Sequence, residues 1–209
     1  MNRPHDLKLC FVAFVGSLLA GPALAQTERE LCARATGDAA LAACDKAIAA
    51  NPKDADSFAN RGFTWSNKGD QDKAIADYNE ALKLNPKHAR ALSNRGVAWN
   101  RKGDHERAIA DSTEAIKINK RYAKAYNNRG VALIRKKEID KAIVDLNESI
   151  KLNPKDASAY FNRGNALEMK GSLSDALADF KKFAELSPKD TDGPAAIARL
   201  EQKIKGRGS

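Results

Sequence analysis

The residues that most often carry chemistry are scarce and scattered in this chain. It has three histidines and three cysteines among 209 residues, and they do not fall at the short spacings at which Cys and His bind a metal. No Gly-rich loop of the kind that cradles phosphate is present. Asp and Glu are abundant, but acid–base catalysis needs two groups that converge in one pocket, and these carboxylates recur at regular intervals. We therefore expect no enzyme activity, no cofactor and no metal site.

Composition excludes two broad classes of protein. Hydrophobic residues make up 43% of the chain and charged residues 30%, with a formal net charge of +9. The chain is too apolar for a disordered polymer and too polar for a protein that crosses a membrane many times. It therefore has enough apolar side chains to form a packed core, and its surface is expected to be basic.

The first 25 residues have the pattern of a secretory signal peptide. Arg3 and Lys8 precede an apolar run over residues 9–20, and Ala23-Leu24-Ala25 follows it. A basic start, a short apolar run and a small-x-small site are typical of such signals. An uncleaved membrane anchor is the alternative, but it needs about 18–20 apolar residues. We expect cleavage after Ala25, a periplasmic or secreted protein, and no membrane span in the mature chain.

Cleavage would also decide how many cysteines remain. It would remove Cys10 and leave Cys32 and Cys44, and an even number of cysteines in an exported chain indicates a disulfide. Cys32 lies near the end of one short helical stretch and Cys44 in the middle of the next, so an antiparallel turn around Gly37 would bring them together. We expect a Cys32–Cys44 disulfide, with two free buried thiols as the alternative.

A period of 34 residues organises the rest of the chain. Asn-Arg-Gly occurs at 60–62, 94–96, 128–130 and 162–164. Counted from residues 55, 89, 123 and 157, each repeat has apolar or small residues at positions 4, 8 and 11, on one helical face. Ala stands at position 20 in every repeat, where a second helix must approach closely. The pattern predicts helix–turn–helix units that stack into one continuous core, because a single hairpin cannot bury its own apolar face.

Each repeat also carries one Arg and one Asp at fixed positions. Asp77, Asp111, Asp145 and Asp179 occupy position 23, and Arg61, Arg95, Arg129 and Arg163 occupy position 7. Two opposite charges that recur together favour a structural ion pair within or between repeats over a ligand-binding role.

The residues at these repeat positions resemble the pattern of the tetratricopeptide repeat (TPR) family. The family pattern has an aromatic at position 4, Gly at position 8, an aromatic at position 11, Ala at position 20 and Pro at position 32. The chain matches with residues such as Phe58, Gly62 and Trp65 and departs from the pattern at Lys120, at Ser112 and at the third turn, where Lys137 replaces Gly. The resemblance implies an all-α, right-handed α-solenoid.

The repeat positions divide the chain into segments. We expect a signal peptide (1–25), a degenerate N-terminal capping repeat (26–54), four repeats (55–88, 89–122, 123–156 and 157–190), and a C-terminal capping helix with a tail (191–209).

The resemblance also implies which positions face the concave groove: 2, 5, 6, 9, 12 and 13. Position 6 holds a ladder of four amides, which suits the backbone of an extended peptide because Asn both donates and accepts hydrogen bonds. A solvated helix surface is the alternative. Basic residues cluster in the second and third repeats and would select acidic side chains. The expected peptide-binding residues are Asn60, Asn94, Asn128, Asn162, Arg90, Lys124, Arg101 and Arg135.

A scaffold that binds a protein or peptide partner, with no enzyme activity, is thus the expected function. The family's two-carboxylate clamp needs Lys and Asn at positions 5 and 9, which are Ala59 and Phe63 in the first repeat and Ser93 and Val97 in the second. One alternative is a structural envelope protein that self-associates. Another is a basic surface that binds an anionic polymer, although export makes nucleic acid an unexpected partner.

Overall fold

The computed structural model describes residues 22–206, with side chains from Thr27, and over that range it is helical with short turns. The helices are α1 (Pro22–Arg34), α2 (Gly37–Ala50), α3 (Ala55–Asn67), α4 (Gln71–Leu84), α5 (Ala89–Arg101), α6 (His105–Ile118), α7 (Ala123–Arg135), α8 (Ile139–Leu152), α9 (Ala157–Lys170), α10 (Leu173–Leu186) and α11 (Asp192–Lys205). The expected all-α fold is confirmed. The basic start and apolar run of the predicted signal lie outside the described residues.

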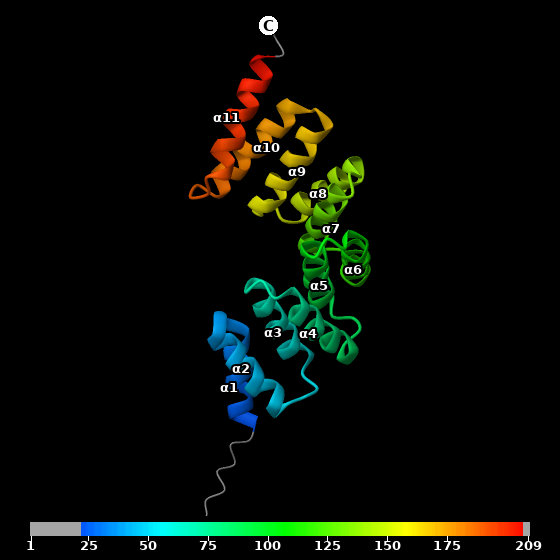
Figure 1. Ribbon diagram of the computed structural model, residues 1–209, viewed down its shortest axis with the longest axis vertical. Helices are drawn as coiled ribbons and strands as arrows, with labels where there is room; N and C mark the ends of the chain where they lie inside the picture. The colour runs from blue at the N-terminus through cyan, green and yellow to red at the C-terminus, as the bar shows by residue number, and fades with distance from the viewer. Residues whose placement is uncertain (1–21, 207–209) are drawn as a thin grey trace, which may run out of the picture.

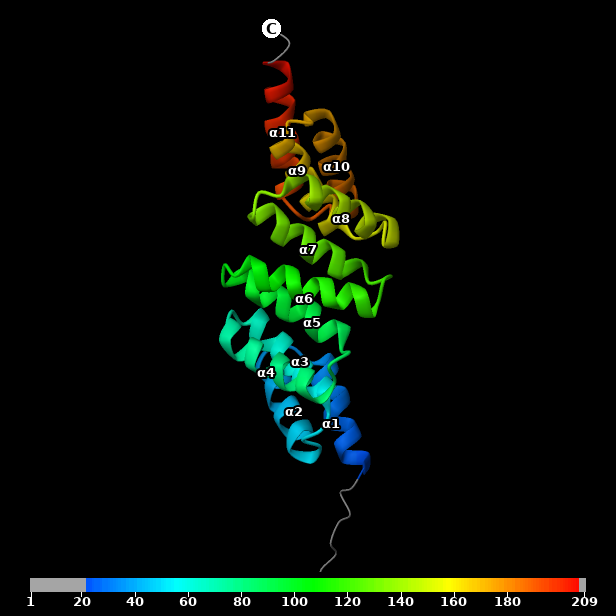
Figure 2. The ribbon, with the colours of Figure 1, turned by 90° about the vertical axis from the view of Figure 1, so that its right-hand side faces the viewer.

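Successive helix pairs follow one another along the long axis, from α1 at one end to α11 at the other (Figure 1). Each helix packs mainly on its neighbours in the chain, and α3, α5, α7 and α9 also contact one another in order. Figure 2 shows the same stack from the side. The architecture is an α-solenoid in which the first helix of each repeat forms one continuous layer.

Small side chains allow the two helices of each repeat to pack closely. A Cβ added at Gly130 would lie 2.8 Å from Cγ of Leu146, and Leu146 is fully buried. The position-20 alanines, such as Ala142, have no exposed surface or almost none. The close approach expected at position 20 is confirmed, and the glycine at position 8 takes part in it.

The turns inside the repeats use a left-handed residue. Gly103 has φ of +87°, and Lys137 takes the same place in the third repeat with φ of +62°. A side chain is strained in this region because its Cβ crowds the backbone, so Lys137 is a local weak point. Asp104, which follows Gly103, then caps α6 by accepting a hydrogen bond from the backbone N–H of Arg107.

The recurrent Arg and Asp form the expected ion pair within each repeat. Nε and Nη2 of Arg129 donate to the two carboxylate oxygens of Asp145 at 2.7 and 2.8 Å. Nη1 of the same guanidinium donates to Oγ1 of Thr113 in the preceding repeat at 3.1 Å. The hydrogen bond to Asp145 raises the pKa of Arg129 above its ordinary value despite partial burial. Each Arg therefore ties its own hairpin together and joins it to the one before.

The two ends of the stack are closed differently. At the first end, a disulfide joins Cys32 of α1 to Cys44 of α2, and both cysteines are buried. At the other end, Leu200 of α11 is fully buried against the last repeat, and Ile197 and Ile204 pack beside it. The C-terminal helix thus covers an apolar face of the last repeat. It begins at Asp192 and so places Pro194 in its first turn, where the missing N–H costs nothing.

Candidate functional site

Four of the eight predicted peptide-binding residues gather around one recess on the layer of first helices. Asn94, Arg101, Lys124 and Asn128 line a cavity of about 140 Å³ between α3, α5 and α7. Phe63 lies at the same recess with 51% of its surface exposed. The first three repeats therefore present amide, cationic and apolar groups at a single place, which we call the groove site.

The four asparagines of the ladder are not equivalent. Nδ2 of Asn128 donates to Oγ of Ser93 at 2.9 Å, and Nδ2 of Asn162 donates to Oδ1 of Asn127 at 3.0 Å. Both bonds reach position 5 of the preceding repeat, so these amide N–H groups join repeats to one another. Asn60 is only 9% exposed and is the ladder member that a ligand reaches least easily.

Asn94 differs because the residue at position 5 of the preceding repeat is Ala59, whose side chain cannot accept a hydrogen bond. Asn94 instead lies in the groove site beside Tyr78, and burial raises the pKa of the Tyr78 hydroxyl above its ordinary value. Position 5 was expected to face the groove, but Ala59 and Ser93 are buried between repeats. The reason is geometric: position 5 lies against the next repeat, where Ser93 bonds to Asn128 and Asn127 bonds to Asn162.

Two of the four predicted cations already have partners inside the chain. Arg90 lies 3.2 Å from Oδ1 of Asp56, and Nη1 of Arg101 donates to the backbone carbonyl and the hydroxyl of Ser66, both at 2.9 Å. Lys124 and Arg135 are exposed and form no ion pair with any residue in 27–206. Lys124 is therefore the uncommitted positive charge of the groove site.

Asp56 lies among three basic side chains, those of Arg29, His88 and Arg90, at the rim of the groove. Arg29 lies 2.8 Å from it and His88 3.2 Å. Partial burial opposes ionisation, but the hydrogen bond from Arg29 and the charges of His88 and Arg90 hold the pKa of Asp56 below its ordinary value. Burial lowers the pKa of His88, against the attraction of Asp56. Sequence reasoning missed this cluster because its members come from three different repeats.

Two more of the predicted residues, Arg135 and Asn162, line a different recess from the groove site. They line a second recess of about 570 Å³ together with Glu168, exposed Met169 and Lys203. Arg199 and Lys203 of α11 contact Glu168 at 2.6 and 3.4 Å. Lys203 was also missed from the sequence, since the capping helix was assigned only the role of covering the core.

Neither a metal site nor a membrane-spanning helix is found in the described part of the chain. Within residues 27–206, no three His, Cys, Asp or Glu side chains gather closely enough to hold a metal ion. None of the helices in residues 22–206 has the length and apolar character needed to cross a bilayer. The groove site thus offers hydrogen bonding, one uncommitted cation among the described residues and an apolar contact.

Comparison with protein families matches four stretches of the chain. A family described as "TPR repeat" matches residues 67–103 and 132–171, and families described as "Tetratricopeptide repeat" match residues 43–76 and 157–190. No curated protein matches the sequence.

Several solved structures are similar. MamA is 30% identical, with a TM-score of 0.61 over 73% of this chain and 89% of that one. A thermophilic TPR protein of Thermus thermophilus, TTC0263, is 23% identical, with a TM-score of 0.72 over 85% and 99%. The first TPR of Spaghetti (RPAP3), bound to the HSP90 peptide SRMEEVD, is 25% identical, with a TM-score of 0.55 over 56% and 93%.

Proposed function

The chain belongs to the tetratricopeptide repeat family, and from that premise we propose that it is a non-enzymatic scaffold that binds an extended acidic segment of a partner protein at the groove site. The observation that carries this proposal is the convergence of Asn94, Asn128 and Lys124 on one recess beside an exposed phenylalanine. Amides suit a peptide backbone, the cation suits a carboxylate, and Phe63 supplies apolar contact.

One solved relative that holds a peptide supports the choice of an acidic ligand. The peptide bound to RPAP3 has two Glu residues and one Asp. This chain lacks the two-carboxylate clamp, because Ser93 is buried and hydrogen-bonded to Asn128 and position 9 is apolar in the first three repeats. Lys124 would take over the recognition of acid groups, with Asn94 on the peptide backbone.

The test is a titration with a defined probe. The acidic heptapeptide Ser-Arg-Met-Glu-Glu-Val-Asp is compared by calorimetry with a version in which Gln and Asn replace Glu and Asp. The acidic form is expected to bind more tightly. Lys124→Ala should weaken its binding by about 1 kcal/mol, or about five-fold, as an exposed ion pair contributes. Asn94→Ala should weaken both peptides equally, since the backbone is the same in each.

Lys155→Ala is the matched control, because it also removes an exposed positive charge, in the turn between α8 and α9. Equal affinity for the two peptides would overturn the acidic preference. An equal loss in Lys124→Ala and Lys155→Ala would instead favour general attraction of anions by a basic surface.

We propose in addition that the protein is exported and keeps its cysteines oxidised. The signal pattern of residues 1–25 and the buried Cys32–Cys44 disulfide support this location. Cleavage after Ala25 would shorten α1, which begins at Pro22, but would leave Cys32 in place. Mass spectrometry of the protein from an envelope fraction should find an N-terminus at Gln26. A full-length, reduced chain in the cytosolic fraction would contradict the proposal.

A further inference from the structure

A third recess lies on another face of α7, away from the groove site. It has a volume of about 530 Å³, within the range of small-molecule pockets. Ile109, Leu133 and Val144 supply its apolar surface, and the charged side chains that line it include Lys141, Glu106, Glu138 and Asp145. Val144 is 67% exposed, so the recess is open to solvent. We call it the outer recess.

The first two repeats show what normally fills this place. Leu133 occupies position 11, where those repeats have Trp65 and Trp99. Both indole rings pack against a core cluster that contains Ile75, the counterpart of Ile109 in the outer recess. The third repeat thus has the surroundings of the tryptophan without the ring.

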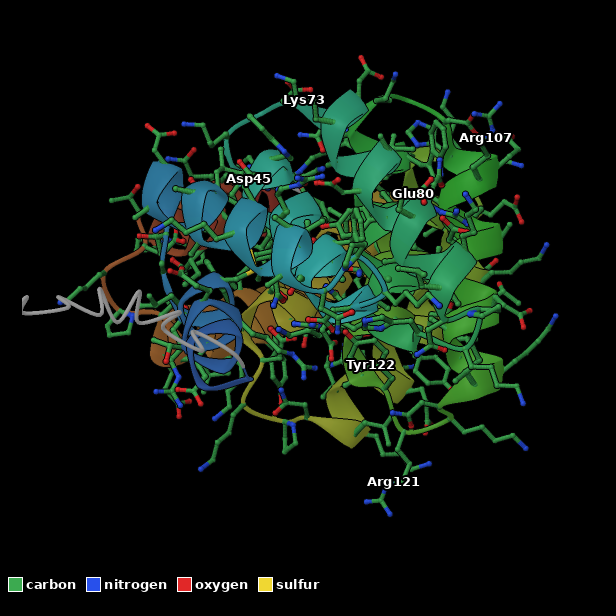
Figure 3. The ribbon with its side chains drawn as sticks, turned by 90° about the horizontal axis from the view of Figure 1, so that it is seen from below. Asp45, Lys73, Glu80, Arg107, Arg121 and Tyr122 are labelled. Atoms are coloured by element: carbon green, nitrogen blue, oxygen red, sulfur yellow. A yellow bond between two sulfur atoms is a disulfide. The ribbon has the colours of Figure 1, made fainter. Side chains whose placement is uncertain are left out.

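A cation covers each of these indoles. Nζ of Lys73 lies 4.3 Å from the centre of the Trp65 ring, and the guanidinium carbon of Arg107 lies 4.4 Å from the centre of the Trp99 ring. Figure 3 shows Lys73 and Arg107 on the outer rim of the solenoid. Lys141 stands at the same repeat position as both. The outer recess therefore keeps the cation that stacks on an aromatic face.

We propose that the outer recess binds an exposed aromatic side chain, with indole preferred, from a partner protein. The ring would lie against Ile109 and Leu133 with Lys141 over its face, as Trp99 lies under Arg107. A second copy of this chain is a poor source of an indole. Its only two tryptophans, Trp65 and Trp99, already pack against the core of the first two repeats.

The fourth repeat explains why the proposal concerns the third repeat alone. It also has Leu in place of Trp, at Leu167, and its equivalent recess measures about 310 Å³. Asp175 stands there in place of the cation. The fourth repeat therefore has no cation at the position that stacks on an aromatic ring, and this cation is the group that makes the outer recess selective.

The experiment follows backbone amide signals by NMR while N-acetyl-tryptophanamide is added to the intact protein, with N-acetyl-leucinamide as the comparison probe. Saturable shifts are expected at Ile109, Leu133 and Val144, with weaker binding of the leucine probe. Lys141→Ala should weaken binding of the tryptophan probe about two- to five-fold, the loss expected for one exposed cation–π contact. Leu133→Trp should abolish binding, because the protein then fills the recess itself as in the first two repeats.

Val144→Glu tests the same site without touching the core, since this side chain is mostly exposed. It should also remove the shifts, even if Leu133→Trp fails to fold. Shifts that persist in Val144→Glu, shifts confined to other residues, or equal binding of the two probes would overturn the proposal. A concentration-dependent mass that Val144→Glu abolishes would assign the recess to a second copy and would also overturn it.

Discussion

Replacing Arg129 tests whether the recurrent ion pair holds the repeats together. The guanidinium makes two hydrogen bonds to Asp145 and one to Thr113. The side chain of Asp145 is only 7% exposed, whereas that of Arg129 is 22% exposed. Arg129→Leu would leave a buried carboxylate without its partner. Breaking a fully buried pair costs about 3–5 kcal/mol. The partial exposure of Arg129 reduces this, and we expect a loss of about 2–3 kcal/mol.

A second variant adds Asp145→Leu to the Arg129→Leu protein. It removes the stranded charge and should restore much of the lost stability. Stability is measured by urea unfolding followed by circular dichroism, with a nearest-neighbour treatment because repeat arrays need not unfold in one step.

Lys151→Leu is the control for the loss of an exposed pair. It breaks the contact with Glu148, in which the lysine side chain is 76% exposed, and should change stability by less than about 0.5 kcal/mol. The reasoning fails if Arg129→Leu costs no more than this control, or if the double variant is no more stable than Arg129→Leu.

Three further predictions concern the cap, a turn and the rim of the groove. Cys44→Ser should destabilise the N-terminal helix pair by about 2–3 kcal/mol, the chain-entropy estimate for so short a loop, and hydrogen exchange should show faster opening of α1 and α2 than of α7. Lys137→Gly should raise the unfolding free energy by about 1 kcal/mol because its φ of +62° suits glycine, and an unchanged denaturation midpoint would contradict this. The folded-state pKa of His88 lies below its ordinary value, so the unfolded chain takes up this proton first as the pH falls. The stabilisation that comes from this difference in pKa is therefore present above about pH 6.5 and is lost as the pH falls towards the folded-state pKa of His88. A His88→Gln variant should show a flatter dependence of the unfolding free energy on pH in that range.

The 34-residue period was enough to predict the fold because each repeat position has the same structural role in all four repeats. Gly130 and Ala142 are small because two helices approach closely at these positions. The Gly-Asp pair at 103–104 ends one helix and caps the next. Such constraints are short in range, so residue type and spacing reveal them. The irregular third turn was also visible, since Lys137 stands where glycine is expected.

The candidate site was only partly predictable because its residues act across repeats. Periodicity marked Asn94 and Asn128 as equivalent, but position 5 of the preceding repeat differs. Ser93 engages Asn128, whereas Ala59 leaves Asn94 without such a partner. The contacts across a repeat interface depend on the side chains of both repeats together. A period of 34 residues does not encode these contacts.

The sequence by itself therefore determined the helix pairs, their order and the ion pair that recurs in each. Those features rest on contacts within one repeat or on the 34-residue period. Only the tertiary structure decided that Arg90 is engaged with Asp56 while Lys124 has no ion-pair partner among the described residues, and that the outer recess stands open where Leu133 replaces a tryptophan. The physical reason is that charge pairing and cavity volume depend on side chains brought together from separate repeats by packing.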